Sequence, residues 1–129
     1  MHTFKVLGGL ALVLALIIGS SFFSSRTLSA SSQRIEEKIL EVETNTYKNN
    51  WDLASNSLSI IIEEWPETEK SWSILLDHSD IDDISTSIFR LSRYLEAEDS
   101  TQTLAEIAAL KQLLKTIPDR EVLSLSNIF

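Results

Sequence analysis

The sequence contains no cysteine, only three glycines and only two prolines in its 129 residues. Without cysteine, the chain can form no disulfide, no thiolate metal site and no cysteine nucleophile. The glycines are Gly8, Gly9 and Gly19, and the prolines are Pro66 and Pro118. Proteins built of β-hairpins need turn residues about every eight to twelve positions, so this distribution excludes a β-sandwich or barrel. It also excludes glycine-rich phosphate loops, and we predict an all-α protein.

Charged residues are absent from one long stretch, the twenty residues between Lys5 and Arg26. As a helix this stretch rises about 30 Å, the thickness of the hydrocarbon core of a bilayer. Residues 1–26 are therefore predicted to be a signal-anchor, with residues 6–25 crossing the lipid bilayer. A cleaved signal peptide is the alternative. The long apolar run and the poorly placed small residues around Ala30 favour the retained anchor.

The orientation of this segment does not follow from its basic residues, because Lys and Arg occur on both sides of it. Segments of this kind usually leave the following domain outside. We therefore expect a single-pass protein of the cell membrane with its C-terminal domain outside the cytoplasm.

Small residues recur every four positions in the apolar segment, at Ala11, Ala15 and Gly19. Such a stripe lets two transmembrane helices pack closely, which makes these residues candidates for helix packing and leaves a homo-oligomer open. Alanine and glycine are also common in any anchor, and we favour this simpler interpretation.

Acidic residues dominate the remainder of the chain. The formal net charge is −8, and nine basic but nineteen acidic residues follow Arg26. This balance argues against nucleic-acid binding, which needs a basic surface. A basic partner or a divalent cation would be compatible with it, although solubility alone explains it.

Residues 33–129 are predicted to form a small antiparallel bundle of four to five helices. Residues 27–32, rich in Ser and Thr, form either a juxtamembrane linker or a polar continuation of the anchor helix. Pro66 either begins a separate helix after Trp65 or kinks one long helix. Pro118 is expected to stop the last helix, and residues 119–129 to pack back on the bundle as a short tail.

Apolar residues recur at spacings of three and four in the predicted helices, which is typical of one buried helical face. Ser79 with Asp82, and Thr103 with Glu106, have the spacing of capping boxes at helix starts. The predicted buried stripes are Ile35, Ile39 and Val42; Trp51, Ala54, Leu58, Ile61 and Trp65; Ile81, Ile84, Ile88, Leu91 and Leu95; and Leu104, Ile107, Leu110, Leu114 and Ile117.

The densest polar cluster contains His78, Asp80 and Asp82. One imidazole among carboxylates can hold a divalent metal, but acidic residues at a helix start are more simply explained by the helix dipole. These three residues are therefore weak metal candidates, and no metal or other cofactor is expected. Only His2 and His78 could act as a base at neutral pH, and no catalytic motif occurs. We expect a protein that is not an enzyme.

Each of the three tryptophans could lie either in the core or at a binding surface. Trp51 and Trp65 lie on one core stripe, so they are predicted to fill the bundle. Trp72 lies outside that stripe and is the better candidate for exposure and for partner binding, because tryptophan is common at interfaces.

The pattern formed by W51-x2-A54-x3-L58…W65, then D77-H78-x-D80-I81-D82, then the end S124-L125-S126-N127-I128-F129, resembles a bacterial family known as domain of unknown function 4363. The resemblance spans most of the chain, and Pro66 departs from the pattern. It implies an N-terminal hydrophobic segment, an all-helical remainder and a similar N-I-F end, from which Asn127 and Phe129 are further partner-binding candidates. The family has no assigned activity. Its members are often encoded beside integral membrane proteins, which implies a partner of that kind.

Two functions are compatible with these features. The first is a non-enzymatic interaction module, anchored in the membrane and binding another envelope or membrane protein. The alternative is an extracytoplasmic sensor whose bundle holds a small ligand or a metal.

Overall fold

The computed structural model describes the backbone of residues 2–128 and the side chains of residues 3–19, 28 and 30–116. Within residues 2–128 the chain forms four α-helices and no strand, as an all-α prediction requires. They are α1 (His2–Tyr47), α2 (Trp51–Trp72), α3 (His78–Glu96) and α4 (Ser100–Ile128).

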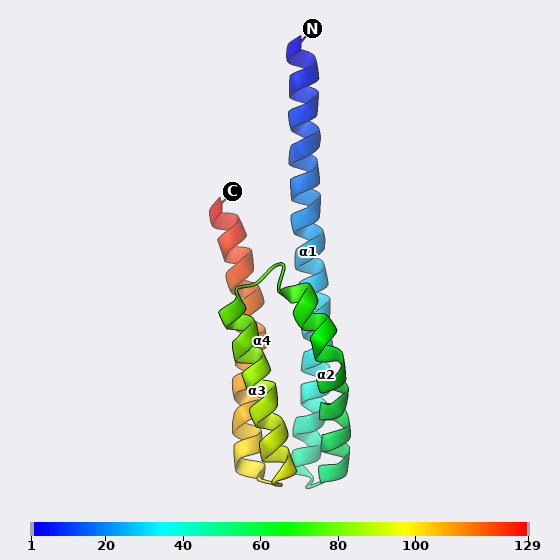
Figure 1. Ribbon diagram of the computed structural model, residues 1–129, viewed down its shortest axis with the longest axis vertical. Coiled ribbons are helices and arrows are strands. Elements are labelled where there is room, and N and C mark those ends of the chain that lie inside the picture. Colours follow the sequence, from blue (N-terminus) through cyan, green and yellow to red (C-terminus); the bar gives the residue numbers. More distant parts are fainter. Residues whose placement is uncertain (1, 129) are drawn as a thin grey trace.

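The helices run alternately down and up as an antiparallel bundle (Figure 1). Each helix packs against its neighbours in sequence, and α4 closes the arrangement against α1. The two short loops at one end join α1 to α2 and α3 to α4, whereas the loop between α2 and α3 lies at the other end. The first half of α1 extends well beyond the bundle on the side of that loop.

The core is built from a heptad-like repeat in every helix, with spacings of three and four residues. This repeat is the one that lets long helices pack at a shallow angle, with the side chains of each helix fitting between those of its neighbours. The predicted stripes of α1 and α3 are confirmed in full by their burial. The buried apolar residues are Leu28, Ile35, Ile39, Val42, Ala54, Leu58, Ile61, Trp65, Trp72, Leu76, Ile81, Ile84, Ile88, Leu91, Leu95, Ile107, Leu110 and Leu114.

Helix α1 is continuous from His2 to Tyr47, so the predicted linker at residues 27–32 is helical. Of the two alternatives for these residues, the helical continuation is the one observed. No glycine or proline follows Gly19 in this helix, and serine and alanine are tolerated in helix interiors. The side chains of Leu28 and Ser32 are already buried, so the bundle begins within the Ser-rich stretch.

Helix α2 passes through Pro66 without ending, so of the two alternatives at this residue the single long helix is the one observed. Pro66 costs a helix interior about 3 kcal/mol. Trp65 and Trp72 lie seven residues apart on the same face and are both buried. Each tryptophan buries about 150–250 Å², which at about 25 cal/mol per Å² corresponds to about 4–6 kcal/mol. The free energy gained by burying both tryptophan rings on one face of a continuous helix therefore outweighs the cost of Pro66 in its interior.

Both predicted capping boxes are wrong. Helix α3 begins after Asp77, with no side-chain hydrogen bond at its cap. Helix α4 begins at Ser100, where the Asp99 carboxylate accepts the Gln102 N–H at 3.1 Å. Thr103 and Glu106 are instead buried inside the bundle.

The prediction that Pro118 stops the last helix is also wrong, because the backbone of α4 continues to Ile128. Residues 119–129 are therefore helical as far as residue 128 rather than a short irregular tail. The side chains of residues 117–129 lie outside the described part of the chain, so the predicted packing of this end on the bundle is not addressed.

The two loops at the end of the bundle remote from the N-terminus of α1 are closed without glycine. Asn49 and Glu98 adopt left-handed backbone conformations, with φ of 57° and 53°. After each of them a backbone N–H bonds five residues back, from Asn50 to the Asn45 carbonyl and from Asp99 to the Tyr94 carbonyl. This is the Schellman ending of a helix, which usually uses glycine at the left-handed position.

Candidate docking surface

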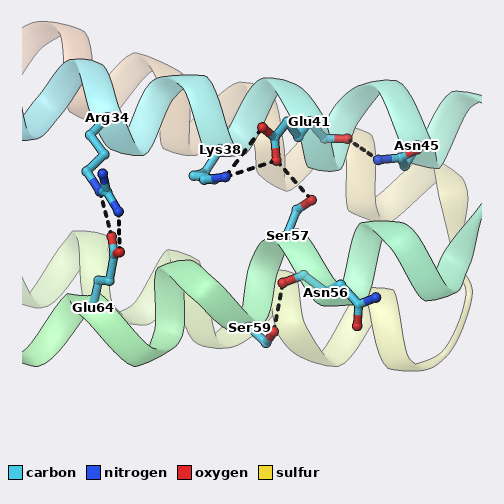
Figure 2. A network of polar contacts seen from close by, with 8 residues as sticks. All are labelled: Arg34, Lys38, Glu41, Asn45, Asn56, Ser57, Ser59 and Glu64. Carbon is cyan, nitrogen blue, oxygen red and sulfur yellow. Dashed lines mark hydrogen bonds and ion pairs between the residues drawn. The ribbon is translucent and has the colours of Figure 1, made fainter.

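Polar side chains join every pair of neighbouring helices. Between α1 and α2, Arg34 binds Glu64 through two hydrogen bonds, one of them 2.9 Å long, and the Ser57 hydroxyl donates to the Glu41 carboxylate at 3.2 Å (Figure 2). The hydrogen bond from Arg34 lowers the pKa of Glu64 below its ordinary value. This pair is exposed, so it fixes the register of the two helices more than it stabilises them.

Helix α4 is joined to α1 and α3 by contacts that include a nearly buried carboxylate. The Glu106 carboxylate accepts hydrogen bonds from the Ser87 hydroxyl at 2.8 Å and from Arg90 Nε at 3.1 Å. Lys111 reaches Glu43 of α1 at 2.7 Å, and the Ser32 hydroxyl donates to the Leu114 carbonyl. These polar groups serve helix packing.

Trp72 is not exposed, which corrects its prediction as a partner-binding residue. Its side chain is only 2 % exposed, and its ring meets that of Trp65 edge to face with centroids 5.6 Å apart. Trp65 Nε1 donates to the Ser85 hydroxyl of α3 at 2.9 Å, whereas Trp72 Nε1 has no hydrogen-bond partner. The two rings therefore belong to the core, as predicted for Trp65, and Trp51 packs partly buried against it.

The weak metal candidates lie at the start of α3. His78 and Asp82 border one shallow hollow, of about 330 Å³, between α2 and α3. Among the described side chains, no group of three or more His, Asp or Glu residues has an arrangement that could hold a metal ion. Asp80 is engaged in an interaction of its own. The hollow is instead bordered by both charged and neutral residues, namely Pro66, Glu69, Lys70, Ser73, His78, Ile81 and Asp82.

A second hollow, of about 200 Å³, lies along the boundary of α2 and α3 toward the other end of the bundle. Serines on both helices leave space there, and apolar side chains form much of its surface. It is bordered by Ser55, Leu58, Ser59, Ile62, Ser92, Leu95 and Glu96.

Large apolar side chains are exposed on both helices, and one of them, Ile62, borders the second hollow. Phe89 of α3 is 65 % exposed and Ile62 of α2 is 45 % exposed. Neither was predicted as a site residue. Phe89 lies off the buried stripe of α3, and an aromatic residue at such a position is the signal in the sequence that could have indicated it.

The charge of the bundle is uneven. Helices α2 and α3 together carry nine acidic and three basic residues. Two of those three basic residues form ion pairs, Arg90 with Glu106 and Arg93 with Glu96. By contrast, residues 28–47 of α1 and 100–116 of α4 carry five acidic and four basic residues. The acidity of the bundle is therefore concentrated on its α2–α3 side.

The other predicted site residues lie in two places. Ala11, Ala15 and Gly19 lie in the part of α1 that extends beyond the bundle, where the space around Gly19 is open. The side chains of Asn127 and Phe129 fall outside the described residues.

No described helix has a stretch long and apolar enough to cross a membrane. The predicted span, residues 6–25, includes residues 20–25, whose side chains lie outside the described part of the chain.

Comparison with known proteins gives one relationship. No curated protein and no solved structure matches the chain. A family described as "Domain of unknown function (DUF4363)" matches residues 22–128, which is most of the chain and the whole of the bundle. The resemblance inferred from the tryptophan, Asp-His and C-terminal patterns is thus confirmed, and the protein belongs to the DUF4363 family.

Proposed function

We propose that the protein is a membrane-anchored helical module that lies outside the cytoplasm and binds another membrane or envelope protein, without catalysing a reaction. The observation that carries the proposal is the first part of α1. Its apolar side chains are exposed along a single helix that has no neighbour (Figure 1). The exposed apolar residues are Phe4, Val6, Leu7, Leu10, Leu12, Val13, Leu14, Leu16, Ile17 and Ile18. A surface of this size must be covered by lipid or by another protein.

The run of uncharged residues favours lipid as the cover. It extends from Val6 to Ser25, which in a helix matches the hydrocarbon core of a bilayer. The helix then continues into the bundle without a break. An anchor connected in this way would hold the bundle at a fixed distance from the membrane surface.

A binding role is supported by how the polar side chains of the bundle are used. Ser57, Ser85, Ser87 and Glu106 are occupied in contacts between helices. The α2–α3 side of the bundle is acidic, and it carries the exposed apolar side chains of Ile62 and Phe89. Exposed apolar residues bordered by charge are typical of protein-binding surfaces.

Cell fractionation tests the anchor. We expect the full-length chain in the membrane fraction, resistant to alkaline carbonate and released by detergent. Leu12→Arg together with Leu16→Arg should move it to the soluble fraction or prevent its accumulation, because each arginine at the centre of a span costs about 3 kcal/mol. Leu40→Arg, at an exposed apolar position of the bundle, is the matched control.

A topology reporter tests the side of the membrane. An enzyme that is active only outside the cytoplasm, fused to the C-terminus of the chain, should be active. Recovery of the unaltered chain in the carbonate-soluble fraction would refute the anchor, and an inactive but intact fusion would refute the location.

A further inference from the structure

Two separate hollows lie along the boundary between α2 and α3. We call this whole boundary the α2–α3 groove, and Ser85 and Phe89 are assigned to it by their helical spacing. Its α2 border is a stripe with spacings of four and three residues, and so is its α3 border. These spacings keep a row of residues on one face of a helix. The α2 stripe is Ser55, Ser59, Ile62, Pro66, Glu69 and Ser73, and the α3 stripe is His78, Asp82, Ser85, Phe89, Ser92 and Glu96.

The hydrogen bond from Trp65 to Ser85 fixes the antiparallel register of the two stripes. In that register Ser59 lies at the level of Ser92, and Glu69 at the level of Asp82, as their shared hollows require. Ile62 and Phe89 therefore lie at the same level, in the middle of the groove. The groove has small serines toward one end, exposed apolar side chains at its centre and charged residues toward the other end.

Pro66 adds an acceptor beside this apolar centre. Proline has no backbone N–H, so the carbonyl of Ile62, four residues earlier, lacks its usual helical donor. Both residues border the groove and are exposed. A carbonyl in this position can accept a hydrogen bond from a side chain of an incoming partner.

The dimensions of the groove fit one helix. From Ser55 to Ser73 the α2 border covers eighteen residue steps, a rise of about 27 Å, which matches a helix of about eighteen residues. An amphipathic helix binds such grooves by placing apolar side chains at spacings of three and four in them. The acidic excess of α2 and α3, including Glu69 and Asp82 on the groove border that also carries Lys70, favours basic residues beside that apolar stripe.

We propose that the α2–α3 groove binds a basic amphipathic helix of another protein, with its apolar stripe over Ile62 and Phe89. This inference rests on the proposed binding function and names the surface and the chemistry of the partner. The Lys or Arg residues of that helix lie against Glu69 and Asp82, at the charged end of the groove. One of its side-chain donors reaches the Ile62 carbonyl.

Site-specific photocrosslinking in the native cell tests the groove. The full-length chain carries p-benzoylphenylalanine in place of Phe89 or, as the matched control, in place of Tyr47. Tyr47 is an equally exposed aromatic residue on α1. Each product is identified by mass spectrometry of its crosslinked peptide. We expect position 89, and not position 47, to capture a segment of another protein with helical apolar periodicity and an excess of Lys and Arg.

The charge requirement is tested in the same cells. Asp82→Lys should lower the yield of the product at position 89 at least about fivefold, because it places like charges opposite each other in the groove. Glu37→Lys makes the same change of charge at an exposed site on α1 and should leave the yield unchanged. Circular dichroism of both purified variants should show unchanged helix content, so that loss of the product reports binding and not unfolding.

Several results would overturn the proposal, and they are distinguishable. Capture at position 89 of a second copy of this chain, of lipid, or of an acidic segment refutes the basic helical partner. Equal capture at both positions, or at position 47 alone, refutes the groove but leaves an interaction module. The absence of a product at either position, from a chain that fractionates with the membrane, refutes the proposed binding function as well.

Discussion

Removal of the Glu106 carboxylate should destabilise the bundle through its effect on Ser87. The Glu106 side chain is 11 % exposed, and it accepts a 2.8 Å hydrogen bond from the fully buried Ser87 hydroxyl. Glu106→Ala leaves this hydroxyl without an acceptor, which costs about 1–3 kcal/mol. It also removes the ion pair with half-exposed Arg90, worth at most about 1 kcal/mol. We expect a total loss of about 1–4 kcal/mol in the free energy of unfolding.

A double-mutant cycle separates this mechanism from a local effect on helix α4. Ser87→Ala alone should cost about 1 kcal/mol. When added to Glu106→Ala it should cost almost nothing, because the hydroxyl that it removes has already lost its acceptor. The expected coupling energy therefore has a magnitude of about 1 kcal/mol.

Equilibrium unfolding in urea, followed by tryptophan fluorescence, measures these free energies. All three tryptophans lie in α2, and two of them are buried, so the signal reports the bundle. Costs that add without coupling, or a loss below about 0.5 kcal/mol for Glu106→Ala, would refute the reasoning.

Three further substitutions test other features, each in the same unfolding assay. Pro66→Ala should raise the free energy of unfolding by about 2 kcal/mol, because it restores a donor to the carbonyl four residues earlier; destabilisation would contradict the account of α2. Glu98→Gly should stabilise by about 1 kcal/mol at most, since glycine adopts the left-handed conformation without strain; a clear loss would argue against that conformation. Glu64→Gln tests the lowered pKa of Glu64. A lowered folded-state pKa contributes stability above the unfolded-state pKa, and this contribution is lost as pH falls through the folded-state value. Glu64→Gln should therefore be less stable than the parent near pH 7, and the difference should shrink as the pH falls; a difference that grows on acidification would contradict this sign.

The buried faces of the helices could be predicted from the sequence because they depend on local periodicity. Ile35, Ile39 and Val42 lie on the core side of α1, as their spacing requires. The stripe of α3 is confirmed in the same way. The helical periodicity alone places residues with this spacing on one face, so the face can be predicted without knowing the neighbouring helix.

The failures concern residues whose partners lie far away in the sequence. Thr103 and Glu106 have the spacing of a capping box, yet the partner of Glu106 is Ser87 on another helix. Pro66 was expected to end a helix or to kink one, and the choice between these depended on the joint burial of Trp65 and Trp72. Sequence patterns around Pro66 say nothing about this burial energy, because it depends on packing against the other helices.

The candidate surface was the least predictable part. In the sequence, nothing distinguishes Phe89 and Ile62 from other apolar residues. They lie at the same height along the bundle only because α2 and α3 pack antiparallel in this register. Trp72, the residue expected at a surface, is buried because α2 does not stop at Pro66. The prediction for Trp72 was therefore wrong because the sequence left open whether one helix continues past Pro66.

The central claim is that α1 carries the apolar segment into the bundle as one unbroken helix. Because the chain has no cysteine, spin labels can be attached only at Leu10→Cys and Leu40→Cys, two exposed positions on α1. Thirty residue steps of helix predict a separation of about 45 Å. Double electron–electron resonance on the full-length chain in lipid bilayers should give one narrow distribution near this distance. A broad distribution centred at a clearly shorter distance would show a flexible linker between the apolar segment and the bundle, and would contradict the account.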